Sequence, residues 1–125
     1  MIKGLGVGFL LILVLLAACG SSSESADERT TITLSDMSFN PTELSALPGE
    51  TIVVVNDDDV SHTVTSESSP NAFDNSGDFD TGSIPPGETV SFEIPVDASL
   101  GDIFYFYCDI HEGIMDTPNG QITVQ

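Results

Sequence analysis

The sequence predicts an all-β domain, an antiparallel sandwich of seven or eight short strands, from three observations. Apolar residues recur at every second position in several short segments, turn-forming residues separate these segments, and no window shows sustained helical periodicity. The first strand is expected at 30–34, where Ile32 and Leu34 share one face. Residues 37–41 are then expected to turn the chain, since they end in Asn40-Pro41.

The remaining strands are predicted by the same pattern of alternation and turns. A strand at 44–47 ends at Pro48-Gly49-Glu50, and the β-branched run at 51–55 is typical of a strand covered on both faces. The Asn/Asp-rich segment 56–59 ends that run, and residues 70–80 are expected to form a long loop with a short strand near Phe79. Further strands are expected at 61–65, 90–94, 103–108 and 121–124.

The aromatic strand at 103–108 fixes the direction of an important side chain. Phe104, Phe106 and Cys108 share one face, whereas Tyr105 and Tyr107 share the other. Because the two phenylalanines are expected in the core, Cys108 should also point inward, at the end of the sandwich.

The first 29 residues have a different composition and are interpreted as targeting and tether segments. Lys3 precedes an apolar run at 5–18 that is too short for a membrane span but fits the core of a signal peptide. Small residues precede Cys19, as in the lipobox of prokaryotic lipoproteins, which implies removal of 1–18 and lipidation of Cys19. An ordinary signal peptide and an uncleaved anchor are the alternatives. Residues 19–29 would form a flexible acidic and Ser-rich tether, and 30–125 one domain.

The charge of the chain is strongly negative. All 20 acidic residues follow the apolar run, and Arg29 is the only basic residue beyond it, so the mature chain would carry a side-chain charge of −19. Such a charge excludes nucleic acid as a partner and repels anionic lipid headgroups, so a covalent anchor is consistent with it. It favours partners with a basic docking face, and it is also typical of proteins that work at high salt.

Few residues of the chain could carry out chemistry, and four of them form a metal-ligand set. His62 and His111 are the only histidines, and Cys108 is the only cysteine besides Cys19. With Met115 they supply two imidazoles, a thiolate and a thioether, the donors of a blue-copper site. An inert buried cysteine and a methionine that only fills the core are the alternatives for Cys108 and Met115. The run Asp57-Asp58-Asp59 lacks the spacing of a calcium loop.

These residues resemble the cupredoxins of the plastocyanin/azurin type over essentially all of 30–125. The resemblance is carried by three separated stretches: Phe39-Asn40-Pro41 with Leu44 and Pro48-Gly49-Glu50-Thr51-Ile52-Val53; Asn56 with Val60-Ser61-His62-Thr63-Val64; and 104–115 followed by Asn119-Gly120-Gln121-Ile122-Thr123-Val124. The resemblance implies a Greek-key β-sandwich with one type 1 copper per chain.

The resemblance also implies a role for each residue at the site. His62, Cys108 and His111 would bind copper in one plane, and Met115 would be the weak axial ligand. His111 would be the port for electrons, and Tyr107 would offer a second exit beside the acidic surface. Thr63 stands where plastocyanins often have Asn, and its hydroxyl is expected to tie the two ligand loops together.

The function expected from these features is electron transfer. We expect a monomeric, non-enzymatic one-electron carrier, exported and anchored by lipid to the outer face of the cytoplasmic membrane, in a periplasm or at the cell surface. It would exchange electrons with redox partner proteins. A copper chaperone or copper-sequestering lipoprotein is the alternative, and a metal-free β-sandwich used for adhesion is a second one.

Overall fold

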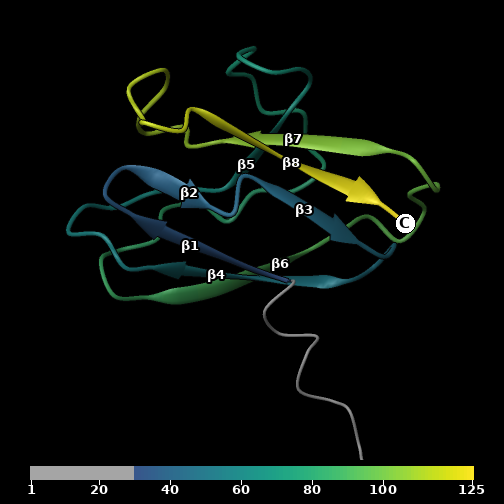
Figure 1. Cartoon of the computed structure of the whole chain (residues 1–125), viewed down its shortest axis with the longest axis horizontal. Helices are drawn as coiled ribbons and strands as arrows, with labels where there is room; N and C mark the ends of the chain where they lie inside the picture. Colours follow the sequence, from purple (N-terminus) through teal and green to yellow (C-terminus); the bar gives the residue numbers. More distant parts are fainter. Residues whose placement is uncertain (1–29) are drawn as a thin grey trace, which may run out of the picture.

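The protein folds as two packed β-sheets with no helix among the residues described. The structure, a computed structural model, describes residues 30–125, and Figure 1 shows the strands in two layers. The strands are β1 (Thr31–Ser35), β2 (Ser38–Asn40), β3 (Glu43–Ala46), β4 (Thr51–Asn56), β5 (Thr65–Glu67), β6 (Thr89–Glu93), β7 (Ile103–Tyr107) and β8 (Asn119–Val124). The predicted all-β class is therefore confirmed.

The strand order shows repeated crossing between the two layers. One sheet has the order β2-β1-β4-β6, and the other has the order β3-β8-β7-β5. The chain passes from the first sheet to the second after β2, returns after β3, and crosses again after β4, β5 and β6. This is the Greek-key sandwich expected from the resemblance.

Two strand pairs differ from the expected antiparallel arrangement. β1 pairs in parallel with β4, and β3 pairs in parallel with β8, whereas the other pairs are antiparallel. Alternation along a strand reports which face is buried, but it contains no information about the direction of a neighbour from another part of the chain. The crossings between sheets produce these parallel pairs.

The core lies between the sheets and is dense in aliphatic and aromatic side chains. The Phe79 and Phe92 rings stack with centroids 4.3 Å apart, and Phe39 meets Phe106 edge to face at 5.1 Å. Gly120 on β8 lies directly under the Phe106 ring, and a Cβ at this position would overlap the ring. Glycine is therefore required at 120 because of close packing.

The strand boundaries agree with the predicted pattern in most places. The segment predicted to turn at 37–41 contains the short strand β2, which pairs with β1 through a turn at Asp36 and Met37, both with positive φ. The predicted strand at 61–65 is displaced, since β5 starts at Thr65 and His62 makes only an isolated bridge with Ile84. In β4 one face is buried and the other only partly covered, so the expectation of two covered faces was wrong.

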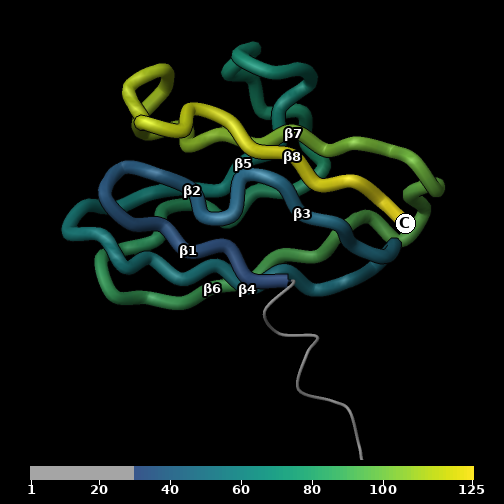
Figure 2. The backbone as a smooth tube through the Cα atoms, viewed as in Figure 1, coloured from purple at the N-terminus to yellow at the C-terminus, as the bar shows by residue number. Residues whose placement is uncertain are grey.

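The loops between strands gather mainly at the two ends of the sandwich. The trace in Figure 2 shows the loop after β5 rising above the layer that contains β7 and β8. The signal-peptide, lipidation and tether predictions for 1–29 lie outside the described residues. Within 30–125 no helix has the length and apolar character needed to cross a membrane.

Candidate metal centre

His62 is held in the interior by its backbone. It lies between β4 and β5, where its N–H donates to the Ile84 carbonyl at 3.1 Å and its carbonyl accepts from the Ile84 N–H at 2.7 Å. Asn56, at the end of β4, donates from its side-chain amide to the Ile84 and Val60 carbonyls at 2.8 and 2.9 Å. This network fixes the segment 56–62, and the His62 side chain is fully buried.

Cys108 follows β7 and points into the core, as the alternation predicted. It is 1% exposed, and within 30–125 it is a free thiol. Its Sγ accepts a hydrogen bond from the Thr63 backbone N–H at 3.3 Å. This bond holds the sulfur beside the residue that follows His62.

His111 and Met115 lie on the loop between β7 and β8. The His111 N–H donates to the Cys108 carbonyl at 3.2 Å, and the Ile114 N–H donates to the His111 carbonyl at 3.1 Å, so two successive turns fold the loop. Gly113 has a φ of 69°, a left-handed conformation that glycine adopts without strain. His111 is partly exposed, whereas Met115 is buried in the core cluster that also contains Cys108.

Three of the four predicted side chains converge on one point. The Cys108 Sγ is 3.7 Å from His62 Nδ1 and 3.5 Å from His111 Nδ1. The ligand atoms of these three residues lie within 4.8 Å of one another, in the part of the chain that the structure describes. The centroids of the His62 and His111 rings are 4.9 Å apart, and the ring planes are tilted by 58°. A thiolate with two imidazoles fits a copper ion, which prefers this mixture of soft and intermediate donors.

The Thr63 hydroxyl connects the two ligand segments, as predicted. Its Oγ1 accepts a hydrogen bond from the Asp109 backbone N–H at 2.9 Å and is 2.9 Å from the Thr65 hydroxyl. The Thr65 hydroxyl in turn donates to Asp80 Oδ1 at 3.1 Å. The residue after His62 therefore holds the residue after Cys108, which sets the spacing of the two ligands.

Asp58 belongs to the candidate site although no sequence pattern predicted it there. Its Oδ2 lies 2.8 Å from His62 Nε2, on the side of the ring away from Cys108. Hydrogen bonds from the Met37 backbone N–H and the His62 ring hold the pKa of Asp58 well below its usual range, so it is a carboxylate. The only local hint was that Asp58 precedes His62 by four residues. In a loop this spacing predicts no contact until the loop conformation is known.

Tyr107 was expected beside the surface because it lies on the outer face of its strand, but it is buried. It is 3% exposed and lies against Phe73 from the loop after β5, with ring centroids 5.8 Å apart. Burial, together with Asp109, Glu112 and two further carboxylates, raises the pKa of Tyr107 above 10.0.

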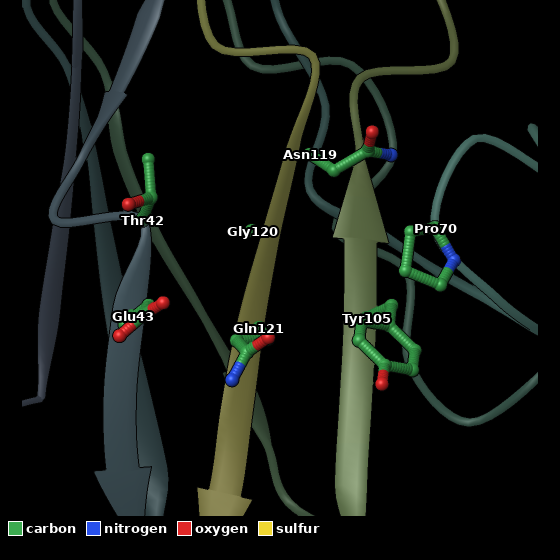
Figure 3. A pocket seen from close by; sticks show the side chains of 7 residues that line it. All are labelled: Thr42, Glu43, Pro70, Tyr105, Asn119, Gly120 and Gln121. Atoms are coloured by element: carbon green, nitrogen blue, oxygen red, sulfur yellow. The ribbon is translucent and has the colours of Figure 1, made fainter.

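A shallow hollow lies elsewhere, on the outer face of the second sheet. It is bounded by Glu43 on β3, Tyr105 on β7 and Gln121 on β8, with Pro70 at its edge (Figure 3). The residues that line it include none of the four predicted ligands. The hollow is therefore separate from the candidate metal centre.

The fold and the donor set together define a small copper-binding β-sandwich. Comparison with known proteins agrees, since residues 8–124 match the family described as a cupredoxin-like domain. The chain therefore belongs to the cupredoxin family, and copper is its cofactor.

Relatives and solved structures with the same fold were also found. The chain is 30% identical over 116 residues to the methylamine utilization protein MauL of Methylophilus methylotrophus, a match that covers 86% of this chain and 63% of the relative. A purple cupredoxin from Nitrosopumilus maritimus superposes with a TM-score of 0.60 at 17% identity, covering 77% of this chain and 99% of that one. Auracyanin A, a blue copper protein from Chloroflexus aurantiacus, gives a TM-score of 0.56 at 17% identity, covering 76% and 96%. At these identities the structures show the shared fold alone.

Proposed function

We propose that this protein is a one-electron carrier with a type 1 copper site. His62 Nδ1, Cys108 Sγ and His111 Nδ1 would bind the copper in one plane, and the Met115 thioether would be the weak axial ligand. Bound copper would supply the redox chemistry by alternating between its two oxidation states. The observation that supports this proposal best is the convergence of the three donor atoms within 4.8 Å, from two separate segments of the chain.

The burial of the ligands favours a carrier over a copper chaperone. His62 is fully buried and Cys108 is 1% exposed, and both are held by backbone hydrogen bonds. Donors in such a site cannot reorganise easily, which suits electron transfer because little rearrangement accompanies the change in charge. The same burial hinders an acceptor from reaching the sulfur, and a chaperone requires that access.

The surface around His111 suits contact with a redox partner. His111 is the partly exposed member of the donor set, and Ile110 and Ile114 beside it are 46% and 66% exposed. Asp109 and Glu112 on the same loop are exposed carboxylates. We propose that electrons pass through the His111 ring edge to a partner with an apolar contact surface and a basic rim. Tyr107 is the proposed second exit, through the Phe73 ring that covers it.

No enzymatic activity is included in this proposal. All four donors of the site belong to the protein, so the proposed coordination leaves no position for a substrate.

We further propose that the chain is exported with 1–18 as its signal peptide, that lipid on Cys19 anchors it to the outer face of the cytoplasmic membrane, and that it acts there as a monomer. Incorporation of labelled fatty acid, compared between the natural chain and Cys19→Ala, tests the anchor.

Two rates measured on the copper-loaded protein distinguish the carrier from the chaperone. Stopped-flow mixing with a small inorganic reductant gives the rate of electron exchange, and competition with a Cu(I) chelator gives the rate of copper loss. We expect fast reduction and slow copper loss. Slow reduction together with fast transfer of copper to the chelator would overturn the carrier proposal in favour of the chaperone.

A further inference from the structure

The outer nitrogen of the buried His62 ring is bound by a carboxylate. His62 Nε2 lies 2.8 Å from Asp58 Oδ2, and the Asp58 side chain is itself only 9% exposed. A neutral imidazole carries one N–H, and a carboxylate accepts hydrogen bonds but cannot donate them. In a neutral ring, the form that binds a metal, the contact places the proton on Nε2 and leaves the lone pair on Nδ1, the nitrogen that lies 3.7 Å from Cys108 Sγ.

Asp58 is itself held rigidly by the backbone around it. Its Oδ2 also accepts from the Met37 N–H at 2.9 Å, and its Oδ1 accepts from the Asp59 N–H at 2.9 Å. The Asp58 N–H donates to Asn56 Oδ1 at 3.0 Å. These bonds fix both oxygens, so the carboxylate is positioned before any metal binds.

The hairpin turn between β1 and β2 connects this carboxylate to the other ligand loop. Met37, in that turn, donates its N–H to Asp58 and accepts at its carbonyl from the Asp116 N–H at 2.8 Å. Asp116 directly follows the proposed axial ligand Met115. Met37, which is not a proposed ligand, therefore contacts Asp58 on one side and the backbone next to Met115 on the other.

We propose that Asp58 is a positioning residue that fixes the tautomer of His62 and lowers the reduction potential of the copper site, an inference that rests on the proposed function. A carboxylate that accepts the outer N–H of a ligand histidine makes the inner nitrogen a stronger donor. Its negative charge, on a side chain only 9% exposed, is weakly screened and also interacts more favourably with Cu(II) than with Cu(I). Both effects favour the oxidised state.

The test compares Asp58→Asn with Asp57→Asn in the full chain loaded with copper. Asparagine at 58 keeps an oxygen for the Met37 and His62 N–H groups, removes the charge, and loses the bond from the Asp59 N–H to Oδ1. Asp57 is an exposed neighbour on the same loop, so Asp57→Asn removes the same formal charge and leaves the His62 contact intact. Spectroelectrochemistry gives the reduction potential of each protein.

We expect Asp58→Asn to weaken Cu(II) binding relative to Cu(I) about tenfold, a typical effect of losing such a partner. For a one-electron couple this corresponds to a potential about 59 mV higher. Asp57→Asn should produce a clearly smaller rise. An unchanged potential in Asp58→Asn, or an equal rise in both variants, would overturn the proposal.

A second measurement needs no variant and covers the case in which Asp58→Asn does not fold. In the Cu(I)-loaded natural protein, NMR should show a His62 Nε2 proton that exchanges slowly with solvent because Asp58 holds it. Fast exchange of this proton would show that Asp58 does not hold it, and this result would overturn the proposal. If the natural protein forms no type 1 site at all, the proposed function fails instead, and the two failures are thereby distinguished.

Discussion

At the scale of single residues, neighbouring side chains at the end of β7 face different surroundings. Cys108 points into the core toward His62, whereas Tyr107 points the other way and is covered by Phe73. Strand alternation predicts the direction of the Cys108 side chain, because Cys108 lies on the core face of the strand. The cover over Tyr107 comes from a loop far away in the sequence, and no local pattern predicts it.

Tyr107 should titrate at an unusually high pH. Burial first, and then the nearby carboxylates, raise the pKa of its phenol above 10.0, because both disfavour the phenolate. The folded state therefore keeps a proton that the unfolded state loses, so stability falls as the pH rises above that value. Spectrophotometric titration should show a tyrosinate phase above pH 10.0 that disappears in Tyr107→Phe. If Tyr107→Phe removes the lower-pH part of the tyrosinate signal and keeps the higher-pH part, the burial argument is contradicted.

Three of the four proposed ligands were predictable from chemistry and local spacing. Cys108, His111 and Met115 lie within one loop, and the folding of that loop follows from short turns and Gly113. His62 lies far from that loop in the sequence, and it was predictable because the chain has so few histidines and because the stretch 60–64 resembles the cupredoxin pattern. The Asp58 contact was not predictable, since it depends on the conformation of the segment after β4.

At the scale of elements, the site depends on loops that join strands of different sheets. His62 follows β4 in one sheet and Cys108 follows β7 in the other. Figure 1 shows both connecting loops at the same end of the sandwich. The sequence predicted where most strands lie, but not the parallel pairs of β1 with β4 and β3 with β8, because those depend on long-range order.

Loss of the Thr63 hydroxyl should loosen the connection between these loops. Thr63→Val keeps the size of the side chain but leaves the Asp109 N–H without its acceptor at 2.9 Å. We expect the free energy of unfolding to fall by about 1–2 kcal/mol, as measured by denaturant titration of the metal-free protein.

Thr51→Val provides the control for this substitution. Thr51 is an exposed position of β4, so the same chemical change there should alter stability much less. Equal effects of the two substitutions would show that the Thr63 hydroxyl has no special part in joining the loops.

At the scale of the whole molecule, the negative charge opposes the compact state. Beyond the apolar run the sequence contains 20 acidic residues and one basic residue, Arg29. Folding brings most of these acidic residues onto one small surface. Because salt shortens the range of this repulsion to about 3 Å at 1 M, stability should rise with ionic strength.

Thermal unfolding followed by circular dichroism, from low salt to molar NaCl, measures this effect. We expect the midpoint to rise steadily with salt. A midpoint indifferent to salt would contradict the view that self-repulsion limits stability, and it would remove the argument for a high-salt habitat.

Spectroscopy shows whether the Cys108 thiolate binds copper together with His62 and His111. The natural protein and Cys108→Ser are titrated with Cu(II) and followed by visible absorption and EPR. We expect an intense thiolate-to-copper band with narrow copper hyperfine splitting, saturating at one copper per chain, and its complete loss in Cys108→Ser. Weak colour and an ordinary tetragonal copper signal in the natural protein would contradict this expectation.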